Sequence, residues 1–130
     1  MGFDLRIESL RPEKSTLHLQ GRLDALTFVE FDKKAESVLA QMAQRGTVVL
    51  DLSALDYISS AGLRSIAKIR KVMRAREGQT LILNPQVQVR KVFDIVKATP
   101  LKEIFANEQE LDDYLARIQQ RALSEDDDGN

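Results

Sequence analysis

The feature that most constrains the fold is a short apolar run, Thr47 to Leu52, between two segments of helical periodicity. The run is rich in β-branched residues and shows no alternation of apolar and polar side chains, which is typical of a strand covered on both faces. Apolar residues recur at helical spacing over residues 31–42 before it and over residues 63–73 after it. Crossovers from strand to helix to strand imply parallel pairing, so we expect an α/β fold.

Further segments complete one mixed sheet. Residues 3–8 and 16–20 alternate apolar and polar side chains, which predicts an antiparallel hairpin. A short buried strand is expected at residues 80–83, and a last short strand at residues 101–105. The predicted order is ββαβαβα(β)α, a single α/β domain with a mixed sheet of four to five strands and about four helices.

The first helix has signals at both ends. Thr27 and Glu30 form a capping box, and Leu26 with Phe31 is placed to form the hydrophobic staple around it. Gly46 stands where a left-handed cap would end this helix, so its last residue is expected near position 45.

The later helices carry similar signals. Gly78 is expected to stop the second helix, and Asn84 with Pro85 opens the third as a capping residue followed by proline at the first helical position. Asn107 and Glu110 form a cap-like pair before the fourth. We expect the domain to span residues 1–120 and residues 121–130 to form an acidic disordered tail.

Composition excludes several classes of function. The formal net charge of −1 gives no overall attraction for nucleic acid, and the absence of cysteine excludes disulfides and thiolate metal sites. No run approaches the roughly 20 apolar residues that span a bilayer, and the first ten residues lack the pattern of a signal peptide. We therefore expect a cytoplasmic protein that does not insert into membranes.

Catalytic signatures are weak. Ser65 and Lys68 fit a Ser-x-x-Lys pattern without its companion motifs, and His18, the one histidine, lies on a strand with no Gly-x-Ser-x-Gly elbow elsewhere. The sequence shows no glycine-rich phosphate loop and no cluster of histidine and carboxylate ligands. We predict that the chain is not an enzyme and that it uses no cofactor and no metal.

The second helix is strongly basic. Six positive charges lie between Arg64 and Arg76 before Glu77 supplies the first negative one. Such a stripe usually marks a solvated face, but it could also meet an acidic partner or the acidic tail of the chain itself.

The junction between the strand at 47–52 and the second helix carries the most functional information. Ser59, Ser60, Ala61 and Gly62 lie there, and such small residues would let the backbone of a partner come close. A hydroxyl at a helix start usually serves as a plain cap. It is also suited to phosphorylation, because the positive end of the helix dipole and the free N–H groups favour a phosphate.

Residues 51–64, which read Asp-Leu-Ser-Ala-Leu-Asp-Tyr-Ile-Ser-Ser-Ala-Gly-Leu-Arg, resemble the STAS domain of bacterial anti-sigma factor antagonists. The preceding element Gly21-Arg-Leu-Asp24 and the later segments 81–85, 89–93 and 99–101 are also similar to that family. The resemblance covers roughly residues 3–118.

The resemblance implies partner switching. In that family the unmodified domain binds an anti-sigma factor that is also a serine kinase, phosphorylation of one serine dissolves the complex, and a serine phosphatase restores binding. The matching serine here is Ser60, with Ser59 as the alternative because this position is often Asp in the family. Asp24 would help to orient the hydroxyl or the kinase, or would only shape a turn. The implied partner-binding residues are Asp24, Ser59, Ser60, Ala61, Gly62, Leu63 and Arg64.

Other roles fit the same family. Stand-alone STAS domains also serve as adaptors in signalling assemblies or as accessory subunits of membrane transport complexes, without a phosphorylation switch. The sequence leaves that alternative open and does not identify the partner.

Overall fold

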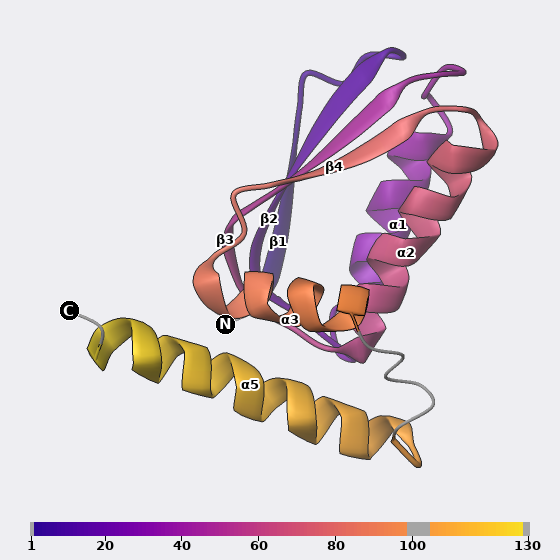
Figure 1. Ribbon diagram of the computed structural model, residues 1–130. Helices are drawn as coiled ribbons and strands as arrows, with labels where there is room; N and C mark the ends of the chain where they lie inside the picture. The colour runs from indigo at the N-terminus through magenta and orange to yellow at the C-terminus, as the bar shows by residue number, and fades with distance from the viewer. Residues whose placement is uncertain (1, 99–104, 129–130) are drawn as a thin grey trace.

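A four-stranded sheet in the order β1-β2-β3-β4 forms the centre of the fold (Figure 1). The computed structural model of the chain describes residues 2–98 and 105–128. β1 pairs antiparallel with β2, whereas β2 with β3 and β3 with β4 are parallel. The predicted hairpin and mixed sheet are therefore confirmed. The strands are β1 (Phe3–Glu8), β2 (Lys14–Leu23), β3 (Thr47–Ile58) and β4 (Gln79–Leu83).

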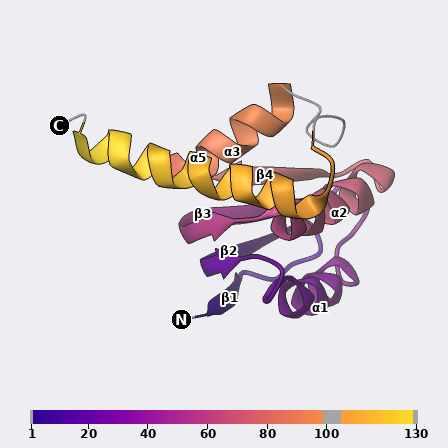
Figure 2. The ribbon, with the colours of Figure 1, turned by 90° about the horizontal axis from the view of Figure 1, so that it is seen from below.

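Helices α1 and α2 pack side by side on one face of this sheet, and α3 and α5 lie across the end of the sheet where β3 leads into α2 (Figures 1 and 2). The described part of the chain thus has the predicted order of strands and helices, apart from the fifth strand. Of the segment expected for that strand, residues 101–104 lie outside the described residues. The helices are α1 (Phe28–Leu39), α2 (Ser60–Ala75), α3 (Val87–Ala98) and α5 (Glu108–Asp128).

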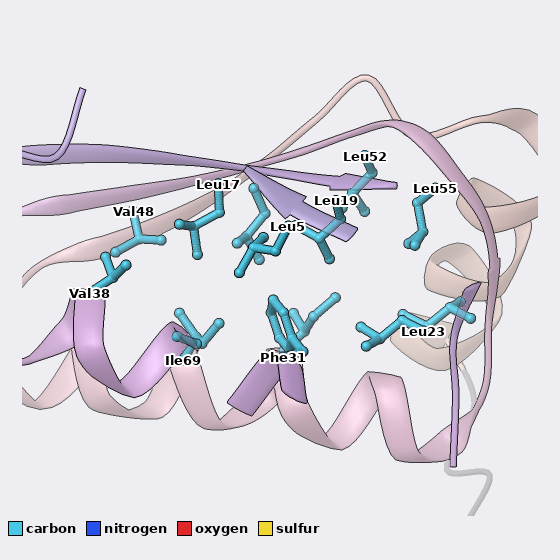
Figure 3. Close-up of a cluster of buried hydrophobic side chains, with 14 of the residues drawn as sticks. Leu5, Leu17, Leu19, Leu23, Phe31, Val38, Val48, Leu52, Leu55 and Ile69 are labelled. Atoms are coloured by element: carbon cyan, nitrogen blue, oxygen red, sulfur yellow. The ribbon is translucent and has the colours of Figure 1, made fainter. Parts of the chain in front are cut away.

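The hydrophobic core lies between the sheet and helices α1 and α2 (Figure 3). Alternate residues of β2 point into it, and Phe31 from α1 meets Phe3 edge to face with ring centroids 5.9 Å apart. The helical spacing seen in the sequence supplies the other side of the core. Its fully buried side chains include Leu17, Leu19, Leu23, Phe31, Leu50, Leu52, Leu55, Ile58, Ile66, Ile69 and Met73.

β3 is six residues longer than predicted, because β2 pairs with it as far as Leu23 opposite Ile58. The polar residues Ser53 and Asp56 hide this extension from a search for apolar runs. β4 pairs with β3 only as far as Asp51. Strand β4 also differs from expectation in being an edge strand with no buried residue.

The capping box predicted for Thr27 and Glu30 at the start of α1 is wrong. Thr27 occupies the N-cap position without a capping side-chain bond, since its hydroxyl donates to the carbonyl of Arg22 at 2.8 Å. The predicted staple is wrong as well, because Leu26 is 91% exposed while Phe31 is buried.

The ends of the helices differ from prediction by several residues. α1 ends at Leu39, and Arg45 rather than Gly46 has the left-handed backbone, with φ of 63°. A Cβ on Gly46 would lie 2.9 Å from the carbonyl oxygen of Pro12, so glycine is needed there for close approach of two chain segments. α2 already ends at Ala75, before Gly78.

The connection into α3 is also longer than predicted. Asn84 is left-handed, with φ of 52°, and α3 begins at Val87, so Asn84 and Pro85 belong to the preceding connection. The carbonyl of Gln86 accepts the first helical hydrogen bond of α3, from Arg90. By contrast, the cap-like pair before α5 is confirmed, because Asn107 accepts a hydrogen bond from the backbone N–H of Glu110 at 2.9 Å.

The acidic tail predicted for residues 121–130 is wrong over residues 121–128, which continue α5. Ala122 is 4% exposed and lies on the same helix face as the buried Leu115 and Gln119. The packed face of α5 therefore extends into the segment that was predicted to be a tail. Residues 129–130 lie outside the described residues.

None of the helices described is long and apolar enough to cross a membrane.

Candidate functional site

The serine pair lies where β3 passes directly into α2. Ser59 is the N-cap residue, with extended backbone angles, and Ser60 is the first helical residue. The N–H of Ser59 donates to the carbonyl of Leu23 at the end of β2, and the carbonyl of Ser59 accepts from Leu63. This contact with β2 fixes the direction in which α2 leaves the sheet.

Neither serine caps α2 with its hydroxyl. The Ser59 side chain makes no capping bond, and its hydroxyl is buried without a hydrogen-bond partner. The alternative of a plain hydroxyl cap at the start of α2 is therefore not formed, because Ser59 holds the N-cap position without a capping side-chain bond.

Helix α5 supplies the missing acceptors. The backbone N–H of Ser60 donates to Asp112 Oδ1 at 2.8 Å, and the Ser60 hydroxyl donates to Glu108 Oε1 at 3.1 Å. Arg64 donates to the same Glu108 oxygen at 2.8 Å. Two carboxylates from α5 thus meet the positive end of the α2 dipole, where negative charge is favoured.

These contacts hold Glu108 in its charged form. The hydrogen bonds from Arg64 and then from Ser60 lower the pKa of the Glu108 carboxyl below its ordinary value. Glu108 nevertheless remains 53% exposed at its side chain, whereas Ser60 is only 3% exposed. The carboxylate therefore shields the hydroxyl while staying in contact with solvent itself.

Gly62 and Ala61 serve the chain's own packing. A Cβ on Gly62 would lie 2.7 Å from the carbonyl oxygen of Leu23 and 2.8 Å from Ile58 Cγ1. Ala61 is 2% exposed. The small residues at this junction let α2 pack closely on the end of the sheet.

Asp24 shapes the start of α1. Its carboxylate accepts a hydrogen bond from the N–H of Leu26 at 2.9 Å, and its backbone carbonyl accepts from Thr27 and Phe28. Arg22, two residues earlier, lies over the ring of Tyr57 with its guanidinium carbon 4.0 Å from the ring centroid. Of the two roles considered for Asp24, the structure shows the turn.

The predicted partner-binding residues therefore fall into two groups. Leu63 and Asp24 are half-buried and Arg64 is exposed, while the four small residues of the junction, Ser59, Ser60, Ala61 and Gly62, are buried. Exposed apolar side chains also lie near the start of α1, where Leu26 is 91% and Val29 is 52% exposed. The surface directly beside Ser60 is formed by Arg64 and the start of α5.

Sequence reasoning missed Glu108 and Asp112. Acidic residues in the first turns of a helix are ordinary, so neither stands out. Their spacing was the one available signal, because like charges four residues apart on a helix repel each other unless a positive group faces them. Here Arg64 and the N-terminus of α2 face them.

Glutamine side chains, two of them buried, complete the open edge of β3 next to this site. The amide of Gln119 on α5 accepts from the N–H of Ile58 at 3.0 Å and donates to its carbonyl at 2.8 Å. Gln86 and Gln88 donate to the carbonyls of Ser53 and Asp56. Side chains thus replace the neighbouring strand beyond the end of β4, and Gln119 fastens α5 to the junction.

Other candidate groups do not converge on this site. His18 lies on the sheet between Glu8 and Asp51, at 2.5 Å and 2.8 Å, in agreement with a sheet-facing histidine. On the basic helix, Lys68 pairs with Asp32 at 2.9 Å. Among residues 2–98 and 105–128, no group of three or more His, Cys, Asp or Glu side chains is arranged so that it could hold a metal ion.

A mixed four-stranded sheet backed by two helices, with a serine pair at the β3–α2 junction, defines the class of small α/β domain that the sequence resembles. The family model for the STAS domain matches residues 8–111, which is most of the chain. The chain belongs to the STAS domain family. The predicted family is thereby confirmed.

Two relatives and a solved structure are similar to the chain. The Bordetella bronchiseptica protein BtrV, by name a candidate anti-sigma factor antagonist, is 42% identical over 65 residues, which is 48% of this chain and 56% of BtrV. An anti-sigma F factor antagonist of Lysinibacillus sphaericus is 25% identical over 82% of this chain and 91% of its own length. The phosphorylated form of the Bacillus cell fate determinant SpoIIAA is 22% identical, with a TM-score of 0.59 over 78% of this chain and 96% of SpoIIAA. This last match supports the fold.

Proposed function

We propose that the chain is a cytoplasmic anti-sigma factor antagonist whose binding is switched at Ser60. Membership of the STAS family and the names of two relatives support the antagonist role. The observation that carries the switch is the position of Ser60 as the first residue of α2, where its N–H already donates to a carboxylate. A site that holds an anion in this way is suited to a phosphate.

The proposed cycle has two forms of the chain. Unmodified, it binds an anti-sigma factor that is also a serine kinase, and thereby frees the sigma factor. The kinase transfers the terminal phosphoryl group of ATP to Ser60 Oγ: the new O–P bond forms, the hydroxyl proton leaves to a base, and ADP departs. A serine phosphatase returns the hydroxyl by hydrolysis, so the chain itself catalyses no step.

Charge explains why the modification would end binding. A phosphate adds roughly −1.5 to −2 charges, which must lose water if the junction is buried against a partner. Glu108 and Asp112 already place two carboxylates there. Added negative charge therefore disfavours any complex that encloses this site.

Phosphate mapping tests the assignment. The full chain is incubated with ATP and, in turn, each serine-kinase anti-sigma factor of the same organism, and the product is analysed by mass spectrometry. We expect one phosphate, on Ser60, which is retained in Ser59→Ala and lost in Ser60→Ala. Phosphate that persists in Ser60→Ala would contradict the assignment, and no transfer by any of these kinases would favour the non-switching adaptor or transport accessory role.

A further inference from the structure

The acceptor proposed above is closed off by the chain itself. Ser60 is 3% exposed, and both its hydroxyl and its backbone N–H donate to carboxylates of α5. Phosphoryl transfer requires the attacking oxygen in line with the leaving group, so the active site of a kinase has to surround the hydroxyl. In this conformation residues 108–112, here called the α5 cap, occupy that space.

The α5 cap and the rest of α5 are held by different contacts. Leu115, Gln119 and Ala122 anchor the later turns through burial and through the two hydrogen bonds to Ile58. The cap is held by Leu111, which is only partly buried against the core, and by polar contacts, in which the side chains of Glu108 and its α2 partner Arg64 are 53% and 48% exposed. Hydrogen bonds at a partly exposed site are exchanged for bonds to water at a small net loss, and Leu111 gives up only partial burial, so opening the cap costs less than releasing the buried anchor.

A phosphate on Ser60 and a closed cap exclude each other. The Glu108 carboxylate oxygen is 3.1 Å from Ser60 Oγ, and Asp112 already takes the Ser60 N–H that a phosphate would use. Like charges at such distances repel, and Arg64 is the cation that contacts the Glu108 side of the cap. Phosphate would therefore compete with the cap for the same donors.

We propose that the α5 cap is an autoinhibitory lid over Ser60, which must lift before a kinase or partner reaches the junction and cannot close once Ser60 carries a phosphate. This rests on the proposed function at Ser60. The lid acts as a competitor within the chain. The apparent affinity of a partner for the junction equals its affinity for the open form multiplied by the fraction of molecules in which the lid is open.

The first test needs no kinase and no partner. Phosphoserine is incorporated at position 60 of the full chain during translation, and backbone amide hydrogen exchange is measured by NMR. We expect residues 109–113 to exchange at least about tenfold faster than in the unmodified chain, while residues 118–122 keep their protection. Phosphoserine at Ser37, an exposed position on α1, is the control and should change neither set. Unchanged protection of residues 109–113 would overturn the proposal.

The second test opens the lid without touching Ser60. Asp112→Ala removes the acceptor of the Ser60 N–H, so the Ser60 amide should exchange about tenfold faster. Asp113→Ala is the matched control, because this exposed neighbour contacts Gln109 on the same helix. A Ser60 amide that stays protected in Asp112→Ala would overturn the lid. Since neither test involves an anti-sigma factor, a failure of the proposed function would appear separately, as absent phosphoryl transfer or binding.

Discussion

At the scale of single residues, two adjacent serines have very different surroundings. Ser59 has a buried hydroxyl without a partner, whereas the hydroxyl of Ser60 contacts an acidic side chain that reaches the solvent. A small movement of α5 would expose Ser60, but Ser59 would still lie under the end of β2 through its bond to Leu23. This difference favours Ser60 as the acceptor on physical grounds that the sequence alone did not offer.

Gly62→Ala tests the packing that fixes the junction. The added methyl would meet the Leu23 carbonyl oxygen at 2.7 Å, so we expect a loss of about 1–3 kcal/mol in the free energy of unfolding. Urea denaturation measures it. Gly2→Ala is the control, because no heavy atom lies within 4 Å of the corresponding methyl position. Equal stability of the two variants would show that α2 does not approach β2 this closely.

Glu108 predicts a pH dependence. Its pKa is lowered in the folded chain from an ordinary value of 4.5, chiefly by the hydrogen bond from Arg64 and next by that from Ser60. The contribution of Glu108 to stability is therefore present above about pH 4.5 and is lost as the pH falls through the lowered pKa. In Glu108→Gln, the free energy of unfolding should decline less between about pH 6 and pH 3 than in the unmodified chain. Parallel declines would argue against the contacts of Glu108.

At the scale of elements, the interiors of helices and strands were predictable and their ends were not. Apolar spacing identified residues 31–42 and 63–73 because burial of one face dominates their energetics. Gly46 was expected to end α1, but glycine is also needed where two chain segments come close together. Asn84 was expected to begin α3, but asparagine also adopts the left-handed backbone of a turn.

The longer β3 depended on side chains from elsewhere in the chain. Its last residues have no strand neighbour on the β4 side, and glutamines of α3 and α5 take that place. A glutamine in a helix gives no sign in the sequence of such a long-range partner. The site itself was half predictable for the same reason: the motif indicated Ser60, but Asp112, 52 residues away in the sequence, was found only in the structure.

Gln119→Leu tests this edge. The variant keeps the side-chain size but leaves the buried N–H and carbonyl of Ile58 without their partner, so we expect a loss of about 2 kcal/mol or more in unfolding free energy. Gln120→Leu alters the exposed neighbour and should change stability by less than about 0.5 kcal/mol. Thermal unfolding of both variants gives the comparison, and a Gln119→Leu chain as stable as Gln120→Leu would contradict the role of Gln119.

At the scale of the whole molecule, the start of α5 lies within the STAS match and the rest of this helix lies beyond it. The STAS match ends at residue 111, whereas α5 continues to Asp128 and covers the junction at which the family resemblance places the acceptor. Helix α5 passes beside the start of α2 (Figure 2), and its Glu108 and Asp112 contact Ser60 there. The family resemblance therefore indicates which serine would be phosphorylated, but not how far α5 covers that serine.

The most direct test of the switch at Ser60 is a binding measurement on the full chain in two modified forms. Chains with phosphoserine at position 60 or at position 59, together with the unmodified chain, are titrated by calorimetry into each serine-kinase anti-sigma factor of the same organism. We predict tight binding of the unmodified chain to one of them and a loss of at least about tenfold in affinity with phosphoserine at position 60, because the added dianion must be desolvated beside two carboxylates. Undiminished binding of that chain would contradict the account.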